Sequence, residues 1–217
     1  MAHDMFPPPP PPLTPDLLLR GYMAGIFPMA EGRADDEVFW VDPRQRGVLP
    51  LHEVHVSRKL ARLMRRTAWR VSLNRDFIGV LEGCADREET WINEQIFEAY
   101  TDLHEMGHAH ALELWDDDDL IGGVYGVAIG GAFFGESMFS RAPSASKVAL
   151  VALCAHLRAC GFSLFDTQFV TPHLASMGAM EIPRETYRAR LREALTVDAD
   201  IRASGVPPHP KDSLSRG

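Results

Sequence analysis

The chain has 217 residues, of which 46% are hydrophobic and 24% are charged. A chain of this length can form one large domain, or a small domain beside a medium one, without disulfides or metals to stabilise its core. The composition excludes wholesale disorder. No run approaches the roughly 20 apolar residues that a transmembrane helix needs, so we exclude a membrane protein.

The N-terminal sequence and the cysteines indicate the compartment. The start has no basic segment followed by an apolar one, so we predict no secretion signal and a cytoplasmic protein. Cys84, Cys154 and Cys160 form neither an even-numbered framework nor a Cys-x-x-Cys pair. We therefore expect reduced thiols.

A proline run and a capped helix open the chain. Pro7–Pro12 are six consecutive prolines, which predict a stiff polyproline II spacer. Thr14 is a good helix N-cap, and the helix that follows is expected to reach about Ala24 and to end at Gly25.

The first fifty residues are too few to hold a core alone. A short strand around 38–41 is ended by Pro43, and we place a soft boundary near Leu51. This predicts a small N-terminal domain at 1–50 and a larger domain at 51–217.

The charge of the chain is unevenly distributed. The formal net charge is −8, yet residues 56–75 carry seven basic residues and no acidic one. An acidic body with one basic segment predicts a local contact with a polyanion, the alternative being a solvated helix face with acidic partners elsewhere in the fold. Ser57 predicts the start of a helix here, with one basic face and an apolar face opposite. The candidate contacts are Arg58, Lys59, Arg62, Arg65 and Arg66.

The remaining pattern alternates strands and helices. Strands are expected at 69–73, 110–115, 120–129, 131–139, 163–170 and 179–182, and helices at 77–84, 91–106, 144–160, 172–177 and 183–195. This order predicts an α/β (α+β) sheet with a mostly antiparallel first half and a helical crossover in the second half.

Three polar residues lie in otherwise apolar strands. Asp166 and Gln168 are two residues apart, which puts both side chains on one face of a strand, and Glu136 interrupts a run rich in Phe, Gly and Met. An unpaired buried charge costs several kcal/mol or shifts its pKa, so these residues indicate a site. The alternative for Asp166 is a turn-capping residue at a solvated strand end.

His104-Glu105-Met106-Gly107-His108 matches the His-Glu-x-x-His zinc pattern. That pattern needs both histidines inside one helix, whereas Gly107 predicts the end of this helix. We therefore expect no metal site here, with a zinc peptidase as the alternative.

Several longer motifs occur together and in order. They are LRGYMAGIFPM, WVDPR, EGCADREETWI, GESMFSRAPSASK, FDTQFV and SMGAMEIPR. On these residues the chain resembles the leucyl/phenylalanyl-tRNA–protein transferase family from about Leu17 to Leu195. The resemblance implies a GNAT-like acyltransferase domain with a mixed, largely antiparallel sheet behind a small N-terminal domain.

The implied reaction takes Leu or Phe, with Met as a further candidate, from aminoacyl-tRNA to the α-amine of a protein that begins with Arg or Lys. The product is marked for N-end rule degradation. An aminoacyl ester is already activated, so no cofactor is expected, and we expect a monomer. A non-catalytic tRNA-binding protein of the same fold is the rival interpretation.

The resemblance also implies roles for single residues. Gln168 orients the attacking amine, Asp166 polarises Gln168 or assists proton removal, and Glu136 binds the cationic acceptor or acts directly in catalysis. Gln is not basic, so positioning must be much of its role.

Binding residues follow from the same resemblance. Tyr22, Trp40 and Trp91 match aromatics that hold the aminoacyl-adenosine end, and the basic helix matches the grip on the tRNA acceptor stem. The aminoacyl pocket is expected to include Val124, Phe133, Met138, Leu150 and Leu153. Phe133 and Met138 have opposite strand parity, so both can face one ligand only across a bulge, most plausibly at Gly135.

The N-terminal part departs from the family pattern. The proline run replaces a glycine-rich lead, Met29 stands where Trp is usual, and the segment before Pro43 is shortened. These changes concern how the N-terminal domain docks and which partner Trp40 has.

Overall fold

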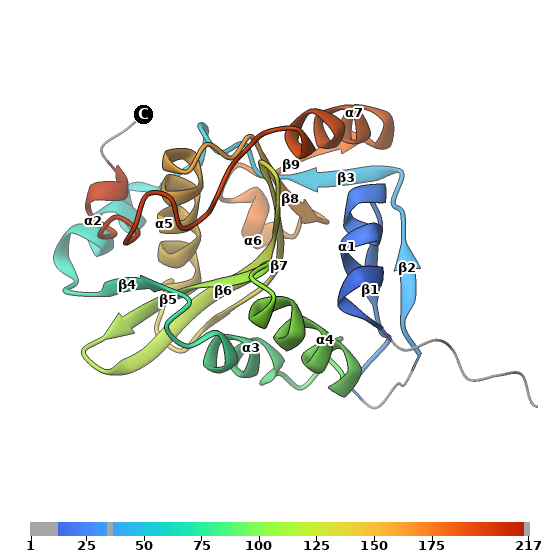
Figure 1. Cartoon of the computed structure of the whole chain (residues 1–217). Helices are drawn as coiled ribbons and strands as arrows, with labels where there is room; N and C mark the ends of the chain where they lie inside the picture. Colours follow the sequence, from blue (N-terminus) through green and yellow to red (C-terminus); the bar gives the residue numbers. More distant parts are fainter. Residues whose placement is uncertain (1–12, 34–36, 215–217) are drawn as a thin grey trace, which may run out of the picture.

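Seven strands form one sheet through the middle of the molecule (Figure 1). The computed structural model describes residues 13–33 and 37–214, so the proline run lies outside the described residues. In spatial order the strands are β4 (Arg70–Leu73), β5 (Ala109–Asp116), β6 (Asp119–Ile129), β7 (Ala132–Ser140), β8 (Leu164–Gln168), β3 (Gln45–Val48) and β9 (Met180–Pro183).

One neighbouring pair in this sheet is parallel. β7 and β8 run in the same direction, because the helix α5 (Ala145–Ala159) connects them as a crossover, and the other neighbours are antiparallel. The predicted mixed, largely antiparallel sheet is confirmed.

Strand β3 joins the early part of the chain to this sheet. Its residues pair with β8 on one side and with β9 on the other. Residues that precede Leu51 therefore lie inside the large sheet and beside β8, a contact that the sequence pattern did not indicate. The division into domains at 1–50 and 51–217 stays a prediction.

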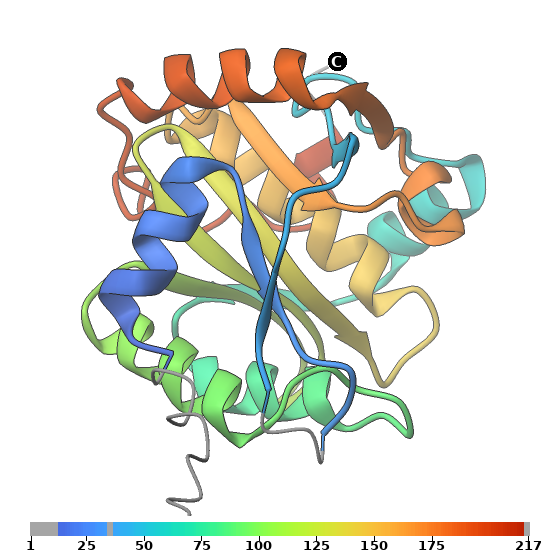
Figure 2. The same ribbon diagram turned by 90° about the vertical axis from the view of Figure 1, so that its right-hand side faces the viewer.

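Helices cover both faces of the sheet (Figures 1 and 2). On one face lie α5, α2 (Arg58–Arg66) and α6 (Pro172–Ala175), whose apolar residues share a core with Leu112, Val124 and Phe133. The other face is covered by α1 (Pro15–Ala24), α3 (Phe77–Ala85), α4 (Glu94–Glu105) and α7 (Arg184–Leu195). The chain ends in a short 3-10 helix, η1 (Asp212–Leu214), beside α5.

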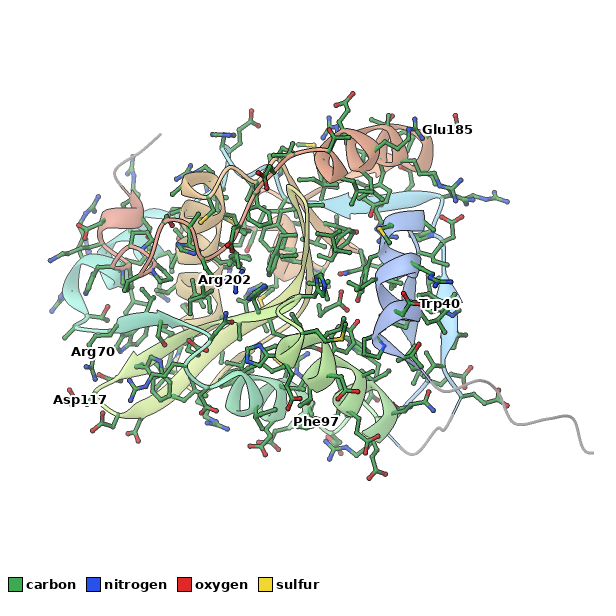
Figure 3. All side chains as sticks on the ribbon, in the orientation of Figure 1. Trp40, Arg70, Phe97, Asp117, Glu185 and Arg202 are labelled. Atoms are coloured by element: carbon green, nitrogen blue, oxygen red, sulfur yellow. The ribbon has the colours of Figure 1, made fainter. Side chains whose placement is uncertain are left out.

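A two-stranded ribbon flanks α1 outside the sheet. Strands β1 (Phe27–Met29) and β2 (Phe39–Val41) are antiparallel and lie beside α1 in Figure 2. Trp40, labelled in Figure 3, packs so closely on Gly21 that any side chain at position 21 would overlap the indole ring. Glycine at position 21 therefore leaves the space in which Trp40 of β2 packs on α1.

Local signals placed most helix starts correctly. Thr14 and Ser57 cap α1 and α2 as predicted, and Gly25 ends α1 in the left-handed conformation. The start of α4 was predicted three residues too early, because Asn93 rather than Trp91 supplies the cap. Ser144 occupies the N-cap position of α5, but its side chain makes no capping hydrogen bond. No helix of the described residues is long and apolar enough to cross a membrane.

Strand β7 contains a bulge, which was expected at Gly135 and lies at the next residue, Glu136. Tyr125 pairs with Ser137 and Gly126 pairs with Gly135, so Glu136 between them has no partner on β6. The extra residue restores the parity of the strand, and Phe133 and Met138 share one face. Glu136 is thereby free to turn toward the opposite face.

Gly126 opposite the bulge permits its close backbone approach. A Cβ there would lie 2.7 Å from the Phe133 ring and closer still to the carbonyl oxygen of Phe134. Gly126→Ala should therefore lower the free energy of unfolding by about 1–3 kcal/mol, as overpacking does. Urea denaturation measures the change. Gly32→Ala is the control, since nothing lies within 4 Å of the added methyl group, and equal stabilities of both variants would contradict the expectation.

Candidate active site

A pocket opens where the parallel strands separate. β7 pairs with β8 only from Ala132 to Phe134, and beyond these residues a cavity of about 620 Å³ lies between the strands. Strand β1, the end of α3, the start of α5 and α6 complete its wall. Its lining includes Phe27, Met29, Trp91, Val124, Glu136, Met138, Phe139, Leu150, Phe165, Gln168, Phe169 and Leu174. The lining also contains polar and charged side chains, among them Asp86, Arg87, Ser137, Arg141, Thr167 and His173, so the cavity combines apolar and polar surface.

Asp166 lies fully buried in β8 and forms an ion pair with Arg46 of β3. Arg46 donates from Nε to Oδ1 at 2.8 Å and from Nη2 to Oδ2 at 2.6 Å. Tyr187 of α7 donates its hydroxyl to Oδ2 at 2.6 Å, and the backbone N–H of Gln168 donates to Oδ1 at 2.9 Å. Both oxygens of the buried Asp166 carboxylate therefore accept hydrogen bonds, and its charge is neutralised by Arg46.

Gln168 ends the strand with its side chain toward the bulge of β7. Its φ is +56°, so the regular alternation of the strand stops here. Its amide nitrogen Nε2 donates to Glu136 Oε1 at 3.0 Å. This bond uses one of the two N–H donors and orients the amide, whose carbonyl is the acceptor that the side chain offers to the pocket.

Glu136 is held by groups from three elements. Besides Gln168, Tyr100 of α4 donates its hydroxyl to Oε2 at 3.0 Å, and Tyr100 is itself bonded to Tyr22 of α1. Burial raises the pKa of Glu136 to about 7, although hydrogen bonds from Tyr22 and Tyr100 act in the opposite direction. Glu136 therefore changes its charge near neutral pH.

The structure thus brings the three predicted catalytic residues together. Glu136 and Gln168 are in contact, and Asp166 contacts Gln168 through the backbone. Sequence reasoning missed Arg46, Tyr100 and Tyr187 as members of this network. An arginine in a short strand beside Gly47 was a usable signal, since a buried carboxylate needs a cation, but the pairing of β3 with β8 was needed to choose among 22 basic residues.

The five predicted aminoacyl-pocket residues divide into two groups. Val124, Met138 and Leu150 line the cavity, whereas Phe133 and Leu153 are absent from its lining. These two are buried in the core beneath the sheet, where Phe133 meets the Phe165 ring edge-on at 5.3 Å. They support the pocket wall, and Phe165 takes the place at its surface.

The three predicted adenosine-binding aromatics are also separated. Trp91 lines the cavity, but Trp40 packs on α1 and is absent from the cavity lining. Tyr22 is fully buried, and together with Tyr100 it contacts Glu136 from the core rather than from the cavity. Phe169, which was not predicted, lines the cavity and is 44% exposed.

The basic helix α2 lies apart from the cavity. None of its residues lines the pocket, and its apolar side packs through Leu60 and Met64. Its five cations are exposed, and among residues 13–33 and 37–214 none of them forms an ion pair. The alternative of a helix face neutralised by acidic neighbours is therefore not what the described residues show.

The histidine pair of the zinc pattern does not form one site. α4 ends at Glu105, and Gly107 has a φ of +80°, so His108 lies outside the helix. His104 donates from Nδ1 to the carbonyl of Ala109 at 2.8 Å and stacks on Phe77. In the part of the chain that the structure describes, no three His, Cys, Asp or Glu side chains are grouped to hold a metal ion.

Known proteins are similar to this chain over nearly its whole length. Residues 48–192 match the family described as leucyl/phenylalanyl-tRNA protein transferase, and residues 12–44 match the N-terminal domain of the same family. A protein of Dinoroseobacter shibae named leucyl/phenylalanyl-tRNA–protein transferase is 74% identical over 217 residues, which cover 100% of this chain and 97% of that protein.

Two further relatives carry the same name. The protein of Ruegeria pomeroyi is 62% identical over 191 residues, covering 88% of this chain and 91% of its own length. That of Cereibacter sphaeroides is 59% identical over 204 residues, covering 94% and 95%. These matches make the protein an aminoacyltransferase, and so an enzyme rather than a non-catalytic binding protein. Within that class, the chain belongs to the leucyl/phenylalanyl-tRNA–protein transferase family.

The buried ion pair between Asp166 and Arg46 should contribute more to the free energy of unfolding than an ion pair near the surface. Asp166→Asn leaves the Arg46 charge without its counterion, which should lower the free energy of unfolding by about 3 kcal/mol, measured by urea denaturation. Asp42→Asn is the control, because Asp42 pairs with Arg184 and Arg188 near the surface and should contribute less than about 1 kcal/mol. Equal losses in the two variants would show that burial does not strengthen the first pair.

Proposed function

We propose that the enzyme transfers Leu or Phe from aminoacyl-tRNA to the α-amino group of a protein that begins with Arg or Lys. The names of the relatives support the donor class, and the resemblance of the catalytic motifs supports the acceptor. The product would be marked for N-end rule degradation. We propose further that the enzyme acts in the cytoplasm as a monomer.

The contact between Gln168 and Glu136 at the wall of a cavity that also has an apolar surface is the observation that carries this proposal. An aminoacyl ester is activated, so the enzyme must align an amine with the ester carbonyl and accept the proton that the amine loses. The amide of Gln168, held by Glu136, presents its carbonyl to the amine. The amide bond forms as the ester bond breaks, and the proton that the amine loses ends on the leaving ribose oxygen, so the tRNA departs with a free hydroxyl group.

The two carboxylates have different environments and hence different roles. Asp166 is fully buried with four hydrogen bonds, so it acts on Gln168 through the backbone N–H group. Glu136 faces the cavity, and its pKa of about 7 suits a group that receives a cationic amine. These properties support the assignment of Glu136 to binding of the acceptor N-terminus rather than to a direct catalytic role.

The apolar part of the cavity suits the donor side chain. Val124, Met138 and Leu150 offer a surface without charge, and the flexible thioether of Met138 can pack against branched or aromatic groups. Trp91 supplies a ring for stacking on the terminal base. The exposed cations of α2 supply phosphate contacts farther along the tRNA.

A transfer assay tests the proposed function. Leu-tRNA and a peptide that begins with Arg should yield a peptide with Leu at its N-terminus, detected by mass spectrometry. The same peptide with an acetylated N-terminus should remain unchanged, because its nitrogen is no longer nucleophilic. Gln168→Ala should lower kcat by roughly 10²-fold through loss of positioning. Absence of transfer by the wild-type enzyme would overturn the proposal.

The charge of Glu136 should make acceptor binding depend on pH. As the pH falls through about 7, Glu136 becomes protonated and loses the charge that attracts the amine, so the KM for the acceptor peptide should rise roughly tenfold between pH 8 and pH 6. Glu136→Gln should remove this dependence. The KM for Leu-tRNA, measured over the same range, is the internal control, and parallel changes in both KM values would contradict the assignment.

The cations of α2 should determine the salt dependence of tRNA binding. Replacement of Arg62 and Arg65 by Glu should weaken binding about tenfold or more and lower the slope of log Kd against log salt by roughly one for each phosphate that is no longer neutralised. Arg190→Glu with Arg192→Glu makes the same charge change on exposed positions of α7 and serves as the control. Unchanged affinity in the α2 variant would remove this helix from the tRNA site.

A further inference from the structure

Arg46 of β3 is buried among groups from β8, β1, α7 and the end of α1. Only 1% of the residue is exposed, although arginine is rarely enclosed in this way. Its Nε and Nη2 atoms form the fork to Asp166, and Nη1 donates to the carbonyl of Gly25 at the end of α1 at 3.0 Å. Each of its three nitrogens thus has a fixed acceptor.

Two aromatic rings hold the guanidinium plane. Its central carbon lies 4.5 Å from the ring centre of Phe27 and 4.5 Å from that of Tyr187. Burial alone would lower the pKa of Arg46, but the charge of Asp166 and the hydrogen bonds to it outweigh burial and raise that pKa. Arg46 therefore remains a cation in a fixed orientation.

Asp166 has no acceptor position left for a substrate. A carboxylate offers about four lone-pair directions. Oδ1 accepts from Arg46 and from the Gln168 N–H, while Oδ2 accepts from Arg46 and from the Tyr187 hydroxyl. The amine proton can reach this carboxylate only if one of these bonds breaks, so proton removal by Asp166 does not fit the geometry.

The hydrogen bond from the Gln168 N–H to Asp166 also fixes the backbone conformation of Gln168. Gln168 has a φ of +56°, a left-handed conformation that residues with a Cβ adopt at a conformational cost. Asp166 Oδ1 holds the N–H of this residue, and the resulting backbone turn directs the Gln168 side chain to Glu136. The orientation of the catalytic amide thus depends on the orientation of a buried carboxylate.

We propose that Arg46 and Tyr187 are positioning residues for aminoacyl transfer, which hold Asp166 so that it fixes the backbone and side chain of Gln168. The proposal rests on the proposed function, since it assigns a role in that same reaction. It ties the catalytic amide to Gly25 and Phe27 in the N-terminal part of the chain and to α7 in the C-terminal part. It also removes Asp166 from the candidate proton acceptors.

Tyr187→Phe tests the proposal with the loss of one hydroxyl group. The variant keeps the ring over Arg46 and removes one of the two hydrogen bonds to Asp166 Oδ2, so kcat should fall about tenfold while the KM values for Leu-tRNA and acceptor peptide stay unchanged. Tyr125→Phe is the matched control, because Tyr125 is equally buried and its hydroxyl has no partner among the described residues.

Arg46→Lys tests the fork. Lysine keeps the charge but cannot make two parallel hydrogen bonds, so kcat should fall roughly 10²-fold. Arg188→Lys, which changes a surface ion pair at Asp42, is the control and should retain wild-type kcat.

Amide hydrogen exchange separates positioning from a merely structural role. In both test variants the Gln168 amide should exchange at least tenfold faster, while amides of β5 and β6 keep their wild-type protection. Wild-type kcat in Tyr187→Phe, or a loss of protection spread over the whole sheet, would overturn the proposal. Failure of the proposed function is distinguishable, because the wild-type enzyme itself would then transfer no Leu.

Discussion

The ion pair between Arg46 and Asp166 is the interaction on which the arrangement of the site depends. It joins β3 to β8 inside the sheet, and through Gly25, Phe27 and Tyr187 it also fastens α1, β1 and α7. A buried pair of this kind adds little net stability compared with apolar packing, but breaking it is costly. Its value to the protein therefore lies in the single orientation that it enforces on groups from distant parts of the chain.

The cavity follows from a change in strand pairing. β7 stays beside β8 for three residue pairs and then departs, while the bulge at Glu136 turns one carboxylate toward the tyrosines on the other face. A continuous parallel pair would have filled this space with a ladder of hydrogen bonds. The same departure leaves apolar side chains of both strands, such as Met138 and Phe165, in the lining of the cavity.

Local sequence signals predicted the regular elements well. Thr14 and Ser57 begin helices, Gly25 and Gly107 end them, and the bulge expected at Gly135 between Phe133 and Met138 occurs one residue later, at Glu136. The assignment was less accurate for side chains whose direction depends on tertiary packing. Phe133 and Leu153 belong to the core, and Trp40 packs on Gly21. These positions were not predicted, because the pattern along one element does not show which neighbouring element covers each of its faces.

The sequence by itself determined the family, the order of the helices and strands except β1 and β3, which were not predicted, and the three polar residues at the site, since each follows from short-range motifs or periodicity. The GNAT-like classification remains a prediction from the resemblance. Tertiary structure alone decided that Arg46 neutralises Asp166, that Tyr100 and Tyr22 support Glu136, and that Asp166 has no free acceptor position. These side-chain contacts join residues 21–120 positions apart, and no local pattern specifies a partner at such distances. The pairing of β3 with β8 brings Arg46 to Asp166, and the packing of α1 and α4 brings Tyr22 and Tyr100 to Glu136.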